Sequence, residues 1–209
     1  MKEYNKIETV YERDINGTKK LIEGKFRSEA VEFLANNKWA FTEKIDGTNI
    51  RVHWDGHRIS FGGRTDKANI PAHLVNKLNE IFLNDETEEL FEQKFGEREV
   101  TLYGEGYGVK IQNGGEYRPD VGFILFDVTI CGNYQSRSTV EDIAKCFGLE
   151  IVPIILYGTI QEGVDFVKTK PNSTIGKAKM EGLVGRPVVE MQDRCGNRII
   201  VKIKVRDFE

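Results

Sequence analysis

The chain has 209 residues, which is long enough to bury a sizeable hydrophobic core. Its composition, 39% hydrophobic and 30% charged with a net charge of -3, is typical of a soluble globular protein. No stretch approaches the ~20 consecutive apolar residues of a membrane-spanning helix, and no apolar segment follows the charged N-terminus. We therefore exclude a membrane protein and do not expect export.

The first half of the chain predicts helices and strands in alternation. Ser28 is a candidate N-cap for a short helix whose apolar positions are Val31, Phe33 and Leu34. Strands are predicted at 39–45, 48–54 and 58–61, with Asp55-Gly56 as the turn between the last two. Pro71 opens a helix with Leu74, Leu78, Ile81 and Phe82 on one face. Two further strands are expected at 98–103 and 122–129.

The second half continues this alternation and ends in a hairpin. Ser138 begins a capping-box pattern before a helix that Gly148 stops. We expect a strand at 151–157 despite Pro153, and then a helix at 161–168. Strands at 183–191 and 199–205 form the final hairpin. This pattern predicts an α+β fold of mostly antiparallel sheets flanked by helices, in a single domain over residues 1–209 with no C-terminal accessory domain.

The charge distribution and the spacing of cysteine and histidine residues limit the kinds of site that the chain can contain. Residues 168–209 carry ten basic and five acidic side chains, which fits either a phosphate-binding surface or a solvated charged face. The cysteines are widely spaced and form no C-x-x-C pair; they are Cys131, Cys146 and Cys195. We expect reduced, buried thiols typical of a cytosolic protein. His53 and His57 flank a turn, so they cannot form a helical zinc pair.

The segment 43–51 contains a candidate nucleophile. Strand alternation places Lys44 on the face opposite Glu43, at the point where the chain turns through Asp46-Gly47. The segment is either an ordinary charged hairpin or the site of a lysine that forms a covalent intermediate. A lysine with the usual pKa of ~10.4 is neutral about once in a few thousand molecules at pH 7, so such a nucleophile needs neighbouring cations or desolvation.

The segment 199–205 places two lysines on one face of a strand. Lys202 and Lys204 alternate with Val201, Ile203 and Val205. An amphipathic edge strand with solvated lysines explains this pattern, and so does a polyphosphate-binding strand. If the pair lies near Lys44, its charge also favours a neutral nucleophile.

Three other segments suit a nucleotide pocket. The glycine-rich stretch 103–108 lacks both G-x-G-x-x-G and G-K-[ST] spacing, which argues against Rossmann and Walker sites. Its Glu105 fits either a ribose contact or a surface acid. Glu181 precedes a buried strand and suits a Mg²⁺ ligand. Arg64 follows two glycines that allow a substrate to approach closely.

Five motifs in order resemble those of the covalent nucleotidyltransferase superfamily, which contains ATP-dependent polynucleotide ligases and mRNA capping enzymes. They are Lys44-Ile45-Asp46-Gly47, Tyr103-Gly104-Glu105, Phe123-Ile124-Leu125-Phe126-Asp127-Val128, Glu181-Gly182-Leu183-Val184 and Lys202-Ile203-Lys204. Within that superfamily, Thr48-Asn49 after the first motif and Arg64-Thr65 downstream resemble phage-type RNA ligases that seal nicks. The resemblance implies an ATP-grasp-like ligase adenylation domain without an OB-fold.

The resemblance also implies roles for individual residues. Lys44 would attack the α-phosphate of ATP to form lysyl-AMP, while Lys202 and Lys204 would neutralise the developing charge. Glu181 would help hold Mg²⁺ or Mn²⁺. The remaining nucleotide-binding set implied by the resemblance is Glu43, Asn49, Arg51, Arg64, Glu105 and Phe126, with Glu105 on the ribose, Phe126 stacked on adenine, and the asparagine and arginines also serving nucleic-acid ends.

The resulting hypothesis is an ATP-dependent RNA ligase acting in RNA repair. It would join 3'-OH and 5'-phosphate RNA ends, on nicked or base-paired RNA, through lysyl-AMP and an AMP-capped 5' end. An accessory protein is a possible partner, and the expected location is the cytoplasm of a bacterium or a phage-infected cell. A minimal DNA ligase or a mixed RNA/DNA nick ligase is the nearest alternative, because 2'-OH recognition depends on pocket geometry. A non-catalytic nucleotide-binding or nucleic-acid-binding module is the third reading.

Overall fold

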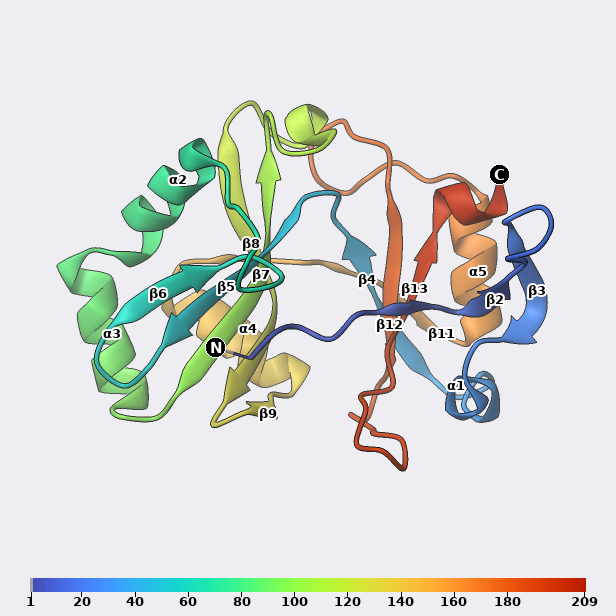
Figure 1. Ribbon diagram of the computed structural model, residues 1–209, viewed down its shortest axis with the longest axis horizontal. Helices are drawn as coiled ribbons and strands as arrows, with labels where there is room; N and C mark the ends of the chain where they lie inside the picture. Colours follow the sequence, from blue (N-terminus) through green and yellow to red (C-terminus); the bar gives the residue numbers. More distant parts are fainter. Residues whose placement is uncertain (1) are drawn as a thin grey trace. The chain divides into compact units, whose positions relative to one another are not determined.

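The computed structural model describes residues 2–209, which divide into two compact units (Figure 1). Unit 1 comprises residues 2–5 and 46–152, and unit 2 comprises residues 6–45 and 153–209. The chain therefore passes between the units three times. None of the helices in residues 2–209 combines the length and apolar character required to span a membrane.

Unit 1 is built on a six-stranded sheet. The strand order is β10-β8-β7-β5-β6, with β9 paired to β8. These strands are β5 (Thr48–Trp54), β6 (Ile59–Gly62), β7 (Val100–Gly108), β8 (Val121–Ile130), β9 (Asn133–Tyr134) and β10 (Glu150–Ile151). The helices are α2 (Ala72–Phe82), α3 (Asp85–Phe95), α4 (Arg137–Cys146) and the short 3-10 helix η1 (Gly114–Glu116).

The three α-helices of unit 1 cover one face of this sheet. Leu78 of α2, Phe91 of α3 and Ile143 of α4 join one apolar core with Val52 and Leu102 of the central strands. Since side chains alternate along a strand, residues on either side of these core positions point to the opposite face. That face carries the polar side chains of unit 1 described below.

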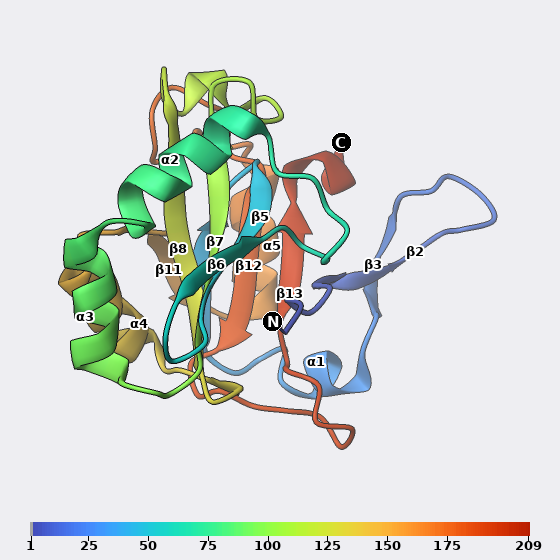
Figure 2. The same ribbon diagram turned by 60° about the vertical axis from the view of Figure 1, so that its left-hand side comes forward.

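Unit 2 contains a five-stranded sheet with the order β1-β13-β12-β4-β11. These strands are β1 (Glu8–Thr9), β4 (Trp39–Lys44), β11 (Ile154–Gly158), β12 (Gly182–Pro187) and β13 (Val201–Lys204). A separate hairpin, β2 (Tyr11–Arg13) with β3 (Leu21–Phe26), reaches away from this sheet (Figure 2). The helices are α1 (Glu29–Phe33), α5 (Ile160–Lys168) and the 3-10 helix η2 (Val205–Phe208).

The core of unit 2 lies on one face of its sheet. Val164 of α5 packs with Phe41, Leu183 and Ile203, which are all fully buried. The glycine at position 163 brings α5 close to the sheet, because a Cβ there would lie 2.7 Å from the Phe41 ring. The apolar face is thereby closed, and the alternate residues of β4 and β13 occupy the other face.

The structure confirms the α+β class with mostly antiparallel pairing; only β1–β13 and β8–β10 are parallel among the strand pairs of residues 2–209. The single strand predicted at 151–157 is wrong. It is two strands in two different sheets, β10 and β11, separated by Pro153. Proline cannot donate to a ladder, so pairing stops there and the chain leaves one sheet for the other.

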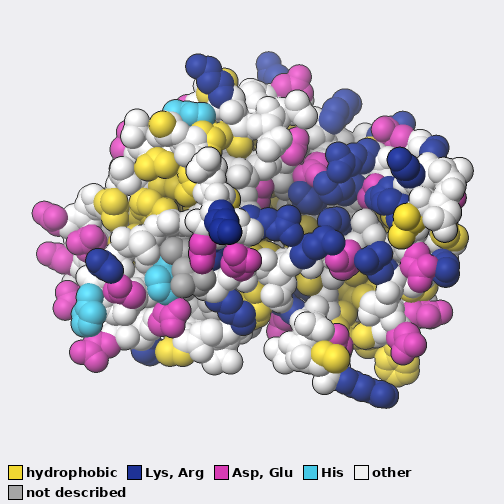
Figure 3. Space-filling view, viewed as in Figure 1, with side chains coloured by type: hydrophobic (Ala, Val, Ile, Leu, Met, Phe, Trp, Pro, Cys, Tyr) yellow, Lys and Arg dark blue, Asp and Glu magenta, His cyan; other side chains and the backbone are white. Residues whose placement is uncertain are grey.

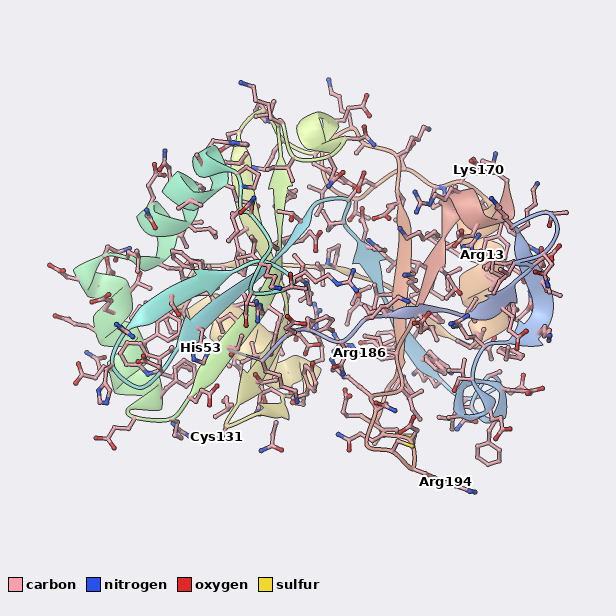
Figure 4. The ribbon with its side chains drawn as sticks, in the orientation of Figure 1. Arg13, His53, Cys131, Lys170, Arg186 and Arg194 are labelled. Carbon is pink, nitrogen blue, oxygen red and sulfur yellow. The ribbon has the colours of Figure 1, made fainter. Side chains whose placement is uncertain are left out.

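Several local predictions also need correction. The N-cap of α4 is Ser136, whose side chain accepts from the backbone N–H of Thr139, so the capping box at Ser138 is wrong. Phe33 is 86% exposed and lies outside the core. The three cysteines are all exposed, not buried; Cys131 lies in the turn after β8 (Figure 4). Helix α3 was not predicted, because its surface is mostly acidic, although Asn84 is a recognisable N-cap.

Candidate functional site

The register of unit 2 brings two of the predicted lysines together. Gly182 pairs with Lys44 of β4 on one side and with Lys204 of β13 on the other. The glycine is required at this position: its φ is +155°, and a Cβ would lie 2.1 Å from the carbonyl oxygen of Ile203. The two lysines therefore flank a position without a side chain, on the face of the sheet opposite the core.

A single carboxylate binds both lysines. Lys44 Nζ lies 2.6 Å from Glu181 Oε2, and Lys204 Nζ lies 2.6 Å from Glu181 Oε1. The side chains of Lys44, Glu181 and Lys204 are only 23%, 16% and 14% exposed, respectively. Burial alone would raise the pKa of Glu181, but the charges and hydrogen bonds of Lys44 and Lys204 outweigh it, and the net pKa is lowered. Glu181 is therefore ionised and bridges two cations.

Lys202 adds a third cation to this face. It pairs with Val184 of β12 and with Thr9 of β1, one alternation along β13 from Lys204. Burial lowers the pKa of Lys202, and the neighbouring charge of Lys204 lowers it further. Lysine and arginine side chains gather over β12 and β13 on the face shown in Figure 3. The arrangement suits a ligand that carries negative charge, such as a phosphate group.

Glu43 is on the opposite side of β4, as strand alternation predicts. It is 1% exposed, and its carboxylate accepts hydrogen bonds from the side chains of Ser173 and Thr174 and from the backbone N–H of Thr174. These partners lie at the end of a small hairpin formed by residues 171–180, which leads directly to Glu181. This contact was not predicted, because the Ser-Thr pair at 173–174 was its only local signal in the sequence.

In unit 1, two predicted nucleotide-binding residues are direct neighbours. Asn49 of β5 pairs with Glu105 of β7, on the face opposite the helices. Among residues 2–209, Asn49 Oδ1 has no hydrogen-bond partner although it is buried. Leaving a buried acceptor unsatisfied costs about 1–3 kcal/mol, which is a reason to expect a donor from a ligand at this position.

Phe126 is half-buried on β8, beside the bulge where β8 shifts register against β7. Tyr4 packs edge-on against it with ring centroids 5.1 Å apart, and the Tyr4 hydroxyl donates to Asp127 Oδ2 at 2.8 Å. The N-terminal segment of unit 1 thus contacts the residue predicted to stack on adenine. No role was predicted for Tyr4, because an isolated tyrosine near the N-terminus belongs to no sequence pattern.

The predicted arginines differ in their surroundings. Arg51 is fully buried and bonds to the loop after β6, whereas Arg64 is exposed in that same loop. Two arginines outside the predicted nucleotide-binding set lie in unit 2: Arg186 is on β12, and Arg194 points away from the sheet in the loop between β12 and β13 (Figure 4). Residues 2–209 contain no cluster of three or more His, Cys, Asp or Glu side chains able to hold a metal ion.

A family model described as RNA ligase matches residues 37–204, which include every predicted motif. The chain belongs to the RNA ligase family. No curated protein matches it.

Solved structures of this family share its fold. They include Naegleria gruberi RNA ligase with PPi, at 18% identity and a TM-score of 0.64 over 100% of this chain and 63% of that one. A variant of the same enzyme with ATP and Mn gives 18% identity and a TM-score of 0.65, covering 86% of this chain and 52% of that one. A variant with AMP and Mn gives 18% identity and 0.67, covering 97% and 62%. The chain spans about half to two thirds of the length of these relatives.

Proposed function

We propose that this chain is an ATP-dependent RNA ligase that transfers AMP through a lysyl-AMP intermediate. The observation that carries the proposal is the bridge of Glu181 between Lys44 and Lys204, beside Lys202. It places a primary amine, two further cations and a carboxylate on one face of a rigid sheet. Such a set can supply a nucleophile and stabilise charge on a phosphate. We further propose that the two units together constitute the nucleotidyltransferase domain.

In the first step, the amine of Lys44 attacks the α-phosphate of ATP. A P–N bond forms, the bond to the β-phosphate oxygen breaks, and pyrophosphate leaves. Attack requires the neutral amine, so the Lys44 ammonium must first give up one proton to solvent water and lose its hydrogen bond to Glu181. Lys202 and Lys204 then neutralise the negative charge that grows on the α-phosphate oxygens.

A divalent cation fits the chemistry of Glu181. Mg²⁺ is commonly held by one or two carboxylates together with substrate phosphates and water, so a lone carboxylate is compatible with it. When bound, such an ion would draw electron density from the phosphate oxygens. Glu181 would hold the ion, and its contacts with Lys44 and Lys204 would have to rearrange for Glu181 to do so.

Unit 1 contributes nucleotide contacts in this proposal. The unsatisfied Oδ1 of Asn49 accepts a hydrogen bond from a donor such as a ribose hydroxyl, and its neighbour Glu105 binds the ribose. Phe126 offers a ring for stacking on adenine, and Tyr4 packs edge-on against the same ring. Arg64 is exposed and available to a phosphate group.

For the later steps, AMP moves from Lys44 to an RNA 5'-phosphate, and an RNA 3'-OH displaces it to seal the strand. A second candidate is a ligase that accepts DNA on one side of the nick, since 2'-OH recognition depends on contacts with the bound strand. Sealing of matched nicked duplexes with RNA or DNA on each side distinguishes them. Faster sealing with ribonucleotides at the 3'-OH side supports the RNA ligase, and equal rates support the mixed-specificity alternative.

The decisive test is the intact mass of the protein after incubation with ATP and Mg²⁺ or Mn²⁺, with GTP in parallel. We expect a gain of one AMP that is absent in Lys44→Ala. Purification in the presence of pyrophosphate removes AMP that the protein carries over from the cell. No adduct on the wild type after that treatment, or an adduct that persists in Lys44→Ala, would refute the assignment. An adduct with GTP instead would indicate capping chemistry.

A further inference from the structure

Arg51 is a charged residue in the interior of unit 1. Its side chain is 0% exposed, on β5, beside the fully buried Tyr103. Arginine remains charged in proteins, so burial is tolerated only where its donors are used. Arg51 Nε donates to the carbonyl oxygen of Gly63 at 2.6 Å, and Nη2 donates to Asp66 Oδ1 at 2.8 Å. Both acceptors belong to the loop that follows β6.

These two contacts lie on either side of Arg64. Residues 63 and 66 are each bonded to Arg51, and Arg64 is between them with an exposed side chain. The loop is compact in its own right, because the backbone N–H of Ala68 donates to the Thr65 carbonyl at 3.1 Å. A Cβ at Gly63 would lie 2.8 Å from the Cβ of Ala68, so the loop closes tightly on itself.

We propose that Arg51 is a positioning residue that fixes the loop 63–68 and thereby presents Arg64 to a phosphate group of the substrate. This inference rests on the proposed function, in which Arg64 binds a phosphate. Arg51 itself does not contact the substrate in this assignment, which changes the direct nucleotide role expected from the sequence. Asp66 is the second anchor point of the loop.

The physical advantage is a reduction in the freedom of the loop. An arginine on a mobile loop loses conformational entropy each time it binds a ligand. The loss is smaller when the loop is already held at two points. The anchor is firm because Arg51 comes from the middle of a paired strand, between β6 and β7. Asp66 is 76% exposed, and its hydrogen bond to Arg51 lowers its pKa, so the carboxylate is ionised at neutral pH.

Asp66→Ala tests the proposal without disturbing the core, because it removes one anchor and leaves Arg51 in place. Trypsin cleaves after Arg64 and Lys67, so the cleavage rate in this loop reports its order independently of activity. We expect Asp66→Ala to be cleaved about tenfold faster, and Asp66→Asn, which keeps the Oδ1 acceptor, to be close to wild type. Lys67→Ala, an exposed change in the same loop, is the control for activity.

A double-mutant cycle then tests whether Asp66 acts through Arg64. We expect Asp66→Ala and Arg64→Ala each to slow AMP attachment or sealing, and the double variant to be within about twofold of Arg64→Ala alone. The positioning role would be overturned if the rate loss in the double variant equals the product of the two single losses. An unchanged cleavage rate in Asp66→Ala would also overturn it. If Arg64→Ala loses nothing in any step, the phosphate role of Arg64 fails, while the cleavage rates still decide whether Asp66 anchors the loop.

Discussion

Replacing Glu181 by glutamine removes the one negative charge between two lysines. Each lysine donates to the carboxylate at 2.6 Å, and the carboxylate is 16% exposed. Hydrogen bonds to charged groups contribute about 1.5–3 kcal/mol each, and the desolvation of a largely buried carboxylate offsets part of this gain. The glutamine oxygen still accepts from one lysine. We therefore expect Glu181→Gln to lower the free energy of unfolding by about 2 kcal/mol at pH 7.

The pH dependence gives this prediction its sign. The pKa of Glu181 is lowered in the folded protein, so its contribution is fully present above the unfolded value of about 4.3 and is lost as the pH falls through the folded value. The difference in stability between wild type and Glu181→Gln should thus be largest at pH 7 and shrink as the pH falls below the unfolded pKa of about 4.3.

Urea denaturation of both proteins at several pH values measures this difference. Glu141→Gln is a suitable control, because its carboxylate pairs with Arg137 while 50% exposed, and we expect a change within about 0.5 kcal/mol. Glu181→Gln should also lose AMP attachment. A variant as stable as the wild type at pH 7, or a difference that does not vary with pH, would refute the reasoning about the bridge.

Three further predictions concern other positions. Lys202→Met should slow AMP attachment yet stabilise the fold at pH 7, because the pKa of Lys202 is lowered on folding. This gain in stability should vanish above about pH 10.4, where the lysine is neutral in both states, and thermal melts at both pH values test it. Gly104→Ala should cost about 2–3 kcal/mol in urea unfolding, since its Cβ would lie 2.3 Å from the Phe123 ring; a neutral result would contradict that packing. Thr174→Val should loosen the 171–180 hairpin from Glu43 and accelerate amide exchange at residues 173–176, and unchanged exchange would exclude the anchor.

Periodicity and turn residues were enough to predict the class of fold and most of its strands. The strand at 48–54 agrees with β5 at both ends, because β-branched and aromatic residues alternate there up to the Asp55-Gly56 turn. Pro153 was misread because its effect is not local: it ends pairing with one sheet so that the chain can enter another. Helix α3 was missed because its apolar residues are few among many acids.

The sequence by itself determined which residues are candidates for the chemistry, since Lys44, Glu181 and the lysine pair stand in recognisable motifs in a fixed order. Tertiary structure alone decided how they meet. Strand pairing on both sides of Gly182 brings together residues that are more than 130 positions apart in the case of Lys44 and Glu181. It also decided that Arg51 faces the interior and binds a loop, because the role of a charged side chain depends on its partners and on its distance from water.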